Sequence, residues 1–249
     1  MSKDPLDHFP RASSAVKPRL VWASYGEVGS GKTHFALSAP GPIVVQSFDR
    51  GLEGVVEPFV TTGKDVRVVE YEWSPTDQLA QDEAIKLRDR FIRDYEIAIQ
   101  HAKTVLWDRE SDIWELFRYA EFGAPSDAPK NYSALNQRYR KYINMAKATD
   151  INFGCIQSVK TAWDSTINPR TGREQPRPTK ERERTGFKEL EGIVHIDLHH
   201  RREDGHFYID VGKSRGPGGQ DVQDQSFMDF SFTDLAMMIF PDTSEADWQ

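Results

Sequence analysis

The sequence predicts an α/β fold with a mainly parallel β-sheet covered by helices on both faces. Short apolar segments alternate with segments of helical period over residues 19–157, the pattern of parallel strands joined by helices. A glycine-rich loop joins the first apolar segment to the first helical one. Near the C-terminus, residues 193–201 and 206–211 flank the turn signal Glu203-Asp204-Gly205, which predicts a β-hairpin.

The elements expected in order follow from apolar period and from turn residues. Strands are expected at residues 19–25, 43–48, 66–73, 104–108 and 151–157. Helices are expected at residues 33–38, 74–102, 111–120, 132–148 and 233–240. In the longest helix the apolar positions recur every three or four residues: Ala84, Leu87, Phe91, Tyr95 and Ala98.

A single domain is expected at residues 18–240, after a flexible N-terminal arm (1–17) and before an acidic C-terminal tail (241–249). Residues 158–187 have no period and few large apolar side chains, so we expect a long functional loop there. No second core is evident from the pattern.

Composition points to a soluble protein of the cytoplasm. The net charge is −7, so any site for a polyanion must come from local charge. The single cysteine, Cys155, lies in an apolar segment, which excludes a disulfide framework. No apolar stretch approaches 18 residues, so no membrane partner is expected. His199 and His200 are adjacent and should face opposite sides of a strand, which argues against a shared metal.

Residues 26–33 read GEVGSGKT, the complete phosphate-loop pattern between a strand and a helix. Its glycines allow backbone amides to point at phosphates, and the helix N-terminus adds partial positive charge. We expect Lys32 to reach the β- and γ-phosphates of ATP and the Thr33 hydroxyl to bind Mg²⁺. The expected nucleotide-binding residues are Gly26, Glu27, Val28, Gly29, Ser30, Gly31, Lys32, Thr33 and His34.

Polar residues at strand ends are candidates for the remaining chemistry. Asp108 closes an apolar strand, expected beside the phosphate-loop strand, and is the candidate second magnesium residue. Asp49 is favoured for orienting the attacking water. The competing acids are Glu70, Glu72 and Glu110, and of these Glu110 is expected to face solvent at a helix start. Gln157, at the end of the next strand, is a candidate sensor of the γ-phosphate, with a solvated strand-end glutamine as the alternative.

Two basic regions are candidates for contacts with polyanions. Lys213 and Arg215 precede a glycine-rich turn and are expected to reach a γ-phosphate, most naturally in a neighbouring subunit. In the expected loop, Trp163 and Phe187 lie among basic residues, a pattern that suits a single-stranded polynucleotide. The candidate nucleic-acid contacts are Lys160, Arg170, Arg173, Arg177, Lys180, Arg182 and Arg184.

Four segments, GEVGSGKT, QSFDRGLEG, LWDRESDIWELFR and INFGCIQSVKTAW, resemble phage-encoded RecA-like P-loop ATPases, some of which act in single-strand annealing and recombination. The resemblance spans residues 19–219. It implies a RecA-like core that binds ATP and Mg²⁺, with Asp108 as the magnesium acid and Gln157 as the sensor. It places Asp49 where the family usually has glutamate. It also implies that Lys213 and Arg215 act between subunits and that the long loop contacts DNA.

Three functions remain open from the sequence. The first is an oligomeric, DNA-stimulated ATPase acting on single-stranded DNA in phage recombination or replication, in the host cytoplasm, with a single-strand-binding or replication protein as a further partner. The second is a nucleotide-dependent helicase loader or partner adaptor, which the acidic tail and Trp248 favour. The third is a P-loop kinase for a small acceptor, with residues 170–184 as a lid.

Overall fold

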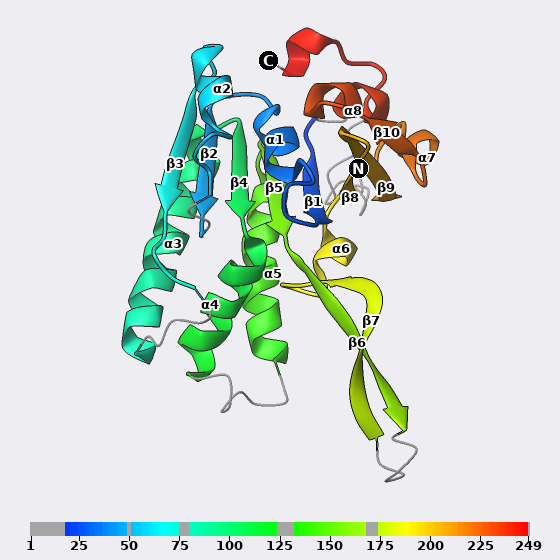
Figure 1. The fold of residues 1–249 in the computed structure, drawn as a ribbon. Helices are drawn as coiled ribbons and strands as arrows, with labels where there is room; N and C mark the ends of the chain where they lie inside the picture. Colours follow the sequence, from blue (N-terminus) through cyan, green and yellow to red (C-terminus); the bar gives the residue numbers. More distant parts are fainter. Residues whose placement is uncertain (1–17, 49–50, 75–79, 124–131, 168–173, 249) are drawn as a thin grey trace, which may run out of the picture.

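The computed structural model describes residues 18–48, 51–74, 80–123, 132–167 and 174–248, and the description below concerns these residues. The fold is α/β, with an eight-stranded sheet in the order β10-β9-β8-β1-β5-β4-β2-β3 (Figure 1). The strands of this sheet are β1 (Val21–Gly26), β2 (Ile43–Ser47), β3 (Val66–Glu70), β4 (Thr104–Asp108), β5 (Asn152–Gln157), β8 (Ile196–Glu203), β9 (His206–Ser214) and β10 (Ser226–Met228). The pairs from β8 to β3 are parallel, and β9 and β10 add an antiparallel edge.

The helices join and cover these strands. They are α1 (Lys32–Leu37), α2 (Glu57–Thr61), α3 (Gln81–His101), α4 (Glu110–Phe122), α5 (Ser133–Ala148), α6 (Leu190–Ile193), α7 (Gly219–Val222), α8 (Phe232–Ile239) and the 3₁₀ turn Glu245–Trp248. The apolar stripe expected on α3 is confirmed, because Ala84, Phe91, Tyr95 and Ala98 are buried and Leu87 packs against them.

Two apolar clusters, one on each face, hold the sheet between the helices. Val21 and Ala23 of β1 face α3, α4 and α5, whereas Leu20 and Trp22 face α1 and α8. This alternation is the period of two that a strand buried on both faces requires. Gly154 of β5 belongs to the same packing: a Cβ there would lie 2.3 Å from the Trp22 ring, so only glycine leaves room for the indole.

The C-terminal hairpin is confirmed. β8 and β9 pair antiparallel, and the turn falls at Asp204 and Gly205, both at positive φ. The acidic C-terminal segment packs on the domain, because its Trp248 is buried against Phe232 and Phe240 of the α8 region.

The expectation of a long loop at residues 158–187 is wrong. This segment contains β6 (Val159–Ile167) and β7 (Glu174–Arg184), an antiparallel pair that forms its own two-stranded sheet and projects from the body (Figure 1). A two-stranded ribbon with solvent on both faces does not need alternating apolar and polar residues. The sequence of this segment therefore lacks the pattern by which a strand is recognised. None of the helices in the described ranges is long and apolar enough to span a membrane.

Candidate functional site

The phosphate-loop motif forms a tight turn between β1 and α1, as its residue types predict. Gly29 and Gly31 have φ of 76° and 89°, a region that glycine adopts without strain, and Gly31 is the N-cap of α1. At Gly26 a Cβ would lie 2.1 Å from the carbonyl oxygen of His200, so neighbouring backbone also requires glycine there. Val28 stands 99% exposed at the apex of the turn.

The Lys32 ammonium lies inside this turn. Its Nζ donates to the carbonyl oxygens of Gly26 and Glu27 at 2.8 and 2.7 Å and lies 3.5 Å from Ser30 Oγ. A cation held by neutral carbonyls in the mouth of a glycine turn is placed to exchange them for phosphate oxygens, which are stronger acceptors. The turn therefore holds a cation where a phosphate group could bind.

Asp108 and Gln157 lie at the carboxyl ends of their strands, on the same side as the phosphate loop, because β1, β4 and β5 are parallel and end together. The expectation that the Asp108 strand is next to β1 is wrong, since β5 lies between β1 and β4. Asp108 is 3% exposed and accepts a hydrogen bond from Ser47 Oγ of β2 at 3.0 Å.

Glu110 differs from its expected position facing solvent. It is fully buried and accepts from Tyr139 Oη and Gln157 Nε2, both at 2.7 Å. Arg109 precedes it at a φ of 60°, a left-handed turn from β4 into α4. Burial raises the pKa of Glu110, and the donated hydrogen bonds act in the opposite direction. This acid is enclosed in the fold and is not placed to orient water.

Gln157 is also buried, at 1% exposure, so the solvated alternative is wrong. Besides donating to Glu110, it accepts from Arg184 Nε at 2.8 Å. Arg184 in turn pairs with Asp197 at 2.7 Å and lies 4.3 Å from the centroid of the Tyr25 ring. A continuous polar chain therefore joins the start of α4, the end of β5 and the base of the β6–β7 hairpin.

The other acids weighed for water orientation fall in different places. Asp49 lies outside the described residues, although Phe48 just before it donates its backbone N–H to the Asp108 carbonyl at 3.4 Å. Glu70 and Glu72 are exposed at the end of the edge strand β3. Three strands, β5, β4 and β2, separate that strand from β1.

Lys213 and Arg215 are not brought to the phosphate loop of their own chain. Ser214 pairs with Ile196, and Ile196 pairs with Trp22. Both basic residues therefore lie near the amino-terminal end of β1, at the opposite end of the strand from the phosphate loop. Lys213 Nζ donates to the carbonyl oxygens of Glu191 and Val194, the latter at 3.1 Å. Burial lowers the pKa of Lys213, and the charge of Arg215 adds to this.

The described basic residues of the β6–β7 hairpin are mostly exposed, and several of them form ion pairs. Arg182 pairs with Glu27 of the phosphate loop at 2.5 Å, and Lys160 pairs with Glu183 at 3.0 Å. Arg177 and Lys180 are exposed on β7. Arg170 and Arg173 lie outside the described residues.

The two aromatic residues expected to stack on bases behave differently. Trp163 is 60% exposed on the hairpin. The expectation for Phe187 is wrong, because it is 2% exposed and its ring lies 4.9 and 5.0 Å from those of Trp114 and Tyr139. It anchors the base of the hairpin to α4 and α5.

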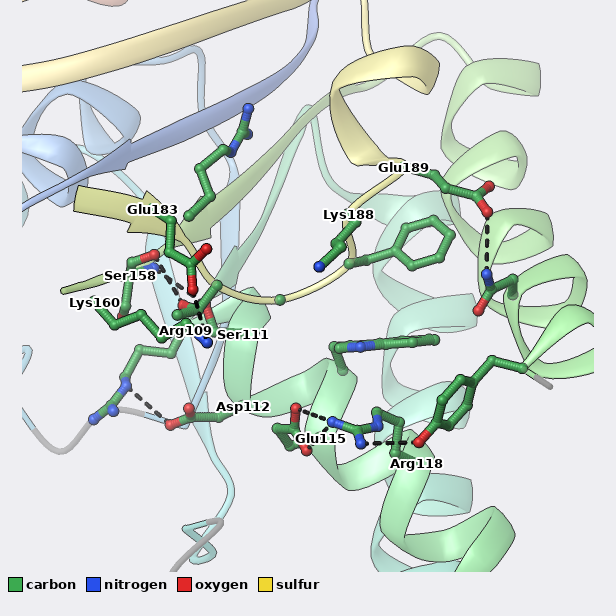
Figure 2. Close-up of a pocket in the computed structure, with 17 residues that line it drawn as sticks. Arg109, Ser111, Asp112, Glu115, Arg118, Ser158, Lys160, Glu183, Lys188 and Glu189 are labelled. Atoms are coloured by element: carbon green, nitrogen blue, oxygen red, sulfur yellow. Dashed lines mark hydrogen bonds and ion pairs between the residues drawn. The ribbon is translucent and has the colours of Figure 1, made fainter. Parts of the chain in front are cut away.

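A cavity of about 820 Å³ lies between the start of α4, the base of the hairpin and the start of α5 (Figure 2). Ser111 Oγ lies 2.7 Å from Thr185 Oγ1 and accepts from Ser158 N, which fixes one wall. On the opposite wall Arg118 donates to Glu115 and to Tyr132 Oη. No sequence pattern predicts this cavity, because its residues come from four separate stretches of the chain and match no motif.

In the described part of the chain, no group of three or more His, Cys, Asp or Glu side chains is arranged to hold a metal ion. The expected magnesium residues are two, Thr33 at the start of α1 and Asp108 at the end of β4, with water completing such a site. No protein-family model matches this chain, and no curated protein matches it in sequence.

Proposed function

We propose that this protein is a RecA-like ATPase that binds ATP with Mg²⁺, hydrolyses it and acts on single-stranded DNA in phage recombination or replication, in the host cytoplasm. The observation that carries the proposal is the turn at residues 26–33, with Lys32 inside it and Asp108 at the same sheet edge. In open α/β sheets, ligands bind at the carboxyl ends of the parallel strands.

In this proposal the amides of the turn and the Lys32 ammonium bind the phosphates, and Lys32 exchanges its bonds to the Gly26 and Glu27 carbonyls for bonds to phosphate oxygens. Thr33 and Asp108 hold Mg²⁺, which neutralises charge on the transferring phosphoryl group when bound. Ser47 keeps the Asp108 carboxylate oriented. Asp49 follows β2, the strand that pairs with β4, and orients the attacking water.

The DNA-binding element in this proposal is the β6–β7 hairpin. Exposed Trp163 offers a ring on which bases stack, and exposed Arg177 and Lys180 contact phosphates. The hairpin is tied to the nucleotide site through the Arg182–Glu27 pair and through Gln157, which bonds Arg184. These contacts offer a direct route by which nucleotide binding alters the grip on DNA.

The proposed assembly is a homo-oligomer with ATP sites between subunits. Lys213 and Arg215 lie at the sheet edge opposite their own phosphate loop, so an arginine-finger role requires a neighbouring chain. A single-strand-binding or replication protein is a further proposed partner.

A small-molecule kinase is the second candidate, and the cavity in Figure 2 favours it. At about 820 Å³ it is large enough for a phosphoryl acceptor, and Arg109, directly after Asp108, lines it. Its charged walls are already paired internally, as in Arg109–Asp112 and Arg118–Glu115, so an acceptor would have to compete with these pairs.

The experiment that separates these functions measures phosphate release from ATP by the full chain, with and without single-stranded DNA. The ATPase proposal expects turnover that single-stranded DNA increases. The kinase alternative expects little phosphate release and transfer of radiolabel from γ-labelled ATP to an added nucleoside or sugar acceptor. Absence of both activities, with nucleotide binding retained, would favour the loader or adaptor.

A further inference from the structure

A smaller cavity of about 190 Å³ lies on the other side of the phosphate loop from Asp108. It is enclosed by α1, by the β8–β9 hairpin and by the chain just before α8. Its walls include Gly31, His34, Ser38, Phe207, Asp229 and Phe230. Gly31, the N-cap of α1, belongs to the phosphate-loop turn and also lines the cavity, so the cavity borders this turn.

We propose that this cavity binds the base of the nucleotide whose phosphates occupy the loop, and that it holds the base by stacking on Phe207 and Phe230. The expected ligands are purine nucleoside triphosphates, with little preference between adenine and guanine. This inference rests on the proposed function, because it requires the loop to bind a nucleotide.

Position is the first argument. β5, β4 and Asp108 lie on one side of β1, and β8 and β9 lie on the other. If Asp108 marks the side of the magnesium and the terminal phosphates, the nucleoside end of the ligand leaves the loop toward β8 and β9. The Phe207 ring is in direct contact with the loop on that side, since a Cβ on Gly31 would lie 2.8 Å from it.

The aromatic wall is the second argument. Phe207 and Phe230 are both partly exposed. The Phe230 ring is held by a stacked contact with Phe227, with centroids 4.7 Å apart and planes at 24°. The Arg202 guanidinium lies 5.3 Å from the centroid of the Phe207 ring. Partly exposed, oriented rings beside a phosphate site are suited to stacking a flat base.

The polar side chains of the cavity support weak discrimination between bases. Asp229 accepts from Phe207 N at 2.9 Å and lies 2.7 Å from His206 Nδ1. Ser38 Oγ donates to the Phe35 carbonyl and accepts from Phe232 N. Because Asp229 and Ser38 already serve the fold, we expect ring area to contribute more to the preference than hydrogen bonds from these two groups, and purines stack over a larger area than pyrimidines.

Calorimetric titration of the full chain tests this, with MgATP, MgGTP, MgCTP and inorganic triphosphate with Mg²⁺ as probes. We expect Phe207→Ala to weaken ATP and GTP binding by about 5- to 150-fold, the size of one lost base–aromatic stack. Triphosphate binding should stay unchanged, which also shows that the loop remains folded. Phe207→Tyr should restore ATP binding. Met228→Ala, an exposed apolar residue on the adjoining β10, is the matched control and should bind every probe as wild type does.

The inference is overturned if Phe207→Ala binds ATP as tightly as wild type, if it loses triphosphate to the same extent as ATP, or if wild type binds CTP as tightly as ATP. Failure of the proposed function gives a different result. In that case wild type binds neither ATP nor triphosphate, or Lys32→Ala binds both as wild type does.

Discussion

Two carboxyl groups two positions apart, Asp108 and Glu110, have different surroundings that assign them different roles. Asp108 ends β4 and accepts a hydrogen bond from the hydroxyl of Ser47. Glu110 begins α4 and is enclosed by Tyr139 and Gln157, with its pKa raised by burial. From sequence position Asp108 is the candidate magnesium residue and Glu110 is expected to face solvent, and only the packing shows that Glu110 is instead enclosed in the core.

Asp108→Asn should keep the fold and lower Mg²⁺-dependent ATP hydrolysis by about a hundredfold, because one formal charge is removed from the metal site. Steady-state turnover across a range of Mg²⁺ concentrations measures this, with circular dichroism as the check on folding. The assignment of the metal acid is wrong if Glu110→Gln abolishes turnover in a folded protein while Asp108→Asn does not.

His200 makes stability depend on pH in a defined direction. Its side chain is buried, 3.0 Å from Ser24 Oγ, and burial lowers its pKa to about 3. The folded state holds the ring neutral, whereas the unfolded chain takes up a proton below pH 6.5. The contribution of His200 to the free energy of unfolding is therefore fully present above that pH and is lost as the pH falls. The free energy of unfolding should drop by about 2 kcal/mol from this residue between pH 7 and pH 5.

Urea unfolding at several pH values measures that loss. His200→Gln keeps a polar group opposite Ser24 and should flatten the pH dependence by this amount. His195, whose pKa burial and nearby cations lower to about 4, retains its own contribution in the variant. An unaltered pH slope in His200→Gln would contradict the assignment.

At the scale of elements, the sequence predicts the buried strands and amphipathic helices well and the β6–β7 hairpin badly. β1, β2, β4 and β5 are apolar enough to show their burial directly, and α3 shows its stripe. The hairpin strand Glu174–Arg184 is almost wholly polar, and its pairing comes from backbone hydrogen bonds with β6 that leave no apolar period. Phe187, which the sequence places in the same segment, is instead part of the core.

The ion pairs in the structure also refine which hairpin residues we propose as contacts to DNA. Arg182, which is exposed, and Arg184, which is half-buried, form ion pairs with Glu27 and Asp197. Arg177 and Lys180 are exposed on β7. The double variant Arg177→Ala/Lys180→Ala should weaken binding to single strands of any sequence. It should lower the salt dependence of log K by about 0.7 per lost contact.

Fluorescence anisotropy with a labelled oligonucleotide at several salt concentrations tests this. The control Lys86→Ala/Arg93→Ala removes the same charge from exposed positions on α3 and should leave affinity unchanged. Equal affinity and equal salt slope in the hairpin variant and wild type would move the DNA site elsewhere.

Across the whole molecule, the parallel strands separate two groups of candidate site residues, one at each end of the strands. The phosphate loop, Asp108 and Gln157 lie at the carboxyl ends of the strands, and Lys213 and Arg215 lie at the other end of β1. The sequence predicts the first grouping because strand ends can be recognised from it. It cannot place Asp108 across β5 from the loop strand, since strand order depends on how distant segments pack.

The whole-molecule packing also bears on the adaptor function. The Trp248 ring is buried against Phe232 and Phe240, so the C-terminal segment offers a partner its acidic groups and not its indole. Trp248, which favoured a partner bound by the tail when only the sequence was considered, therefore serves mainly to pack the C-terminal segment onto the domain.

A mixing experiment tests the proposed inter-subunit sites. Arg215→Ala lacks the finger and Lys32→Ala lacks the phosphate-binding lysine, so each variant alone should hydrolyse ATP poorly. In a mixed oligomer some sites combine an intact loop from one chain with an intact finger from the other, and activity should return. If the mixture is no more active than its separate components, the basic pair does not act between subunits.

Turnover by Lys32→Ala tests the proposal that the turn at residues 26–33 binds and activates ATP. Loss of the ammonium that faces the β- and γ-phosphates should reduce ATP binding or turnover by about a hundredfold or more. Lys86→Ala, an exposed lysine on α3, is the matched control and should behave as wild type. Turnover of pure Lys32→Ala protein equal to that of wild type would contradict the account.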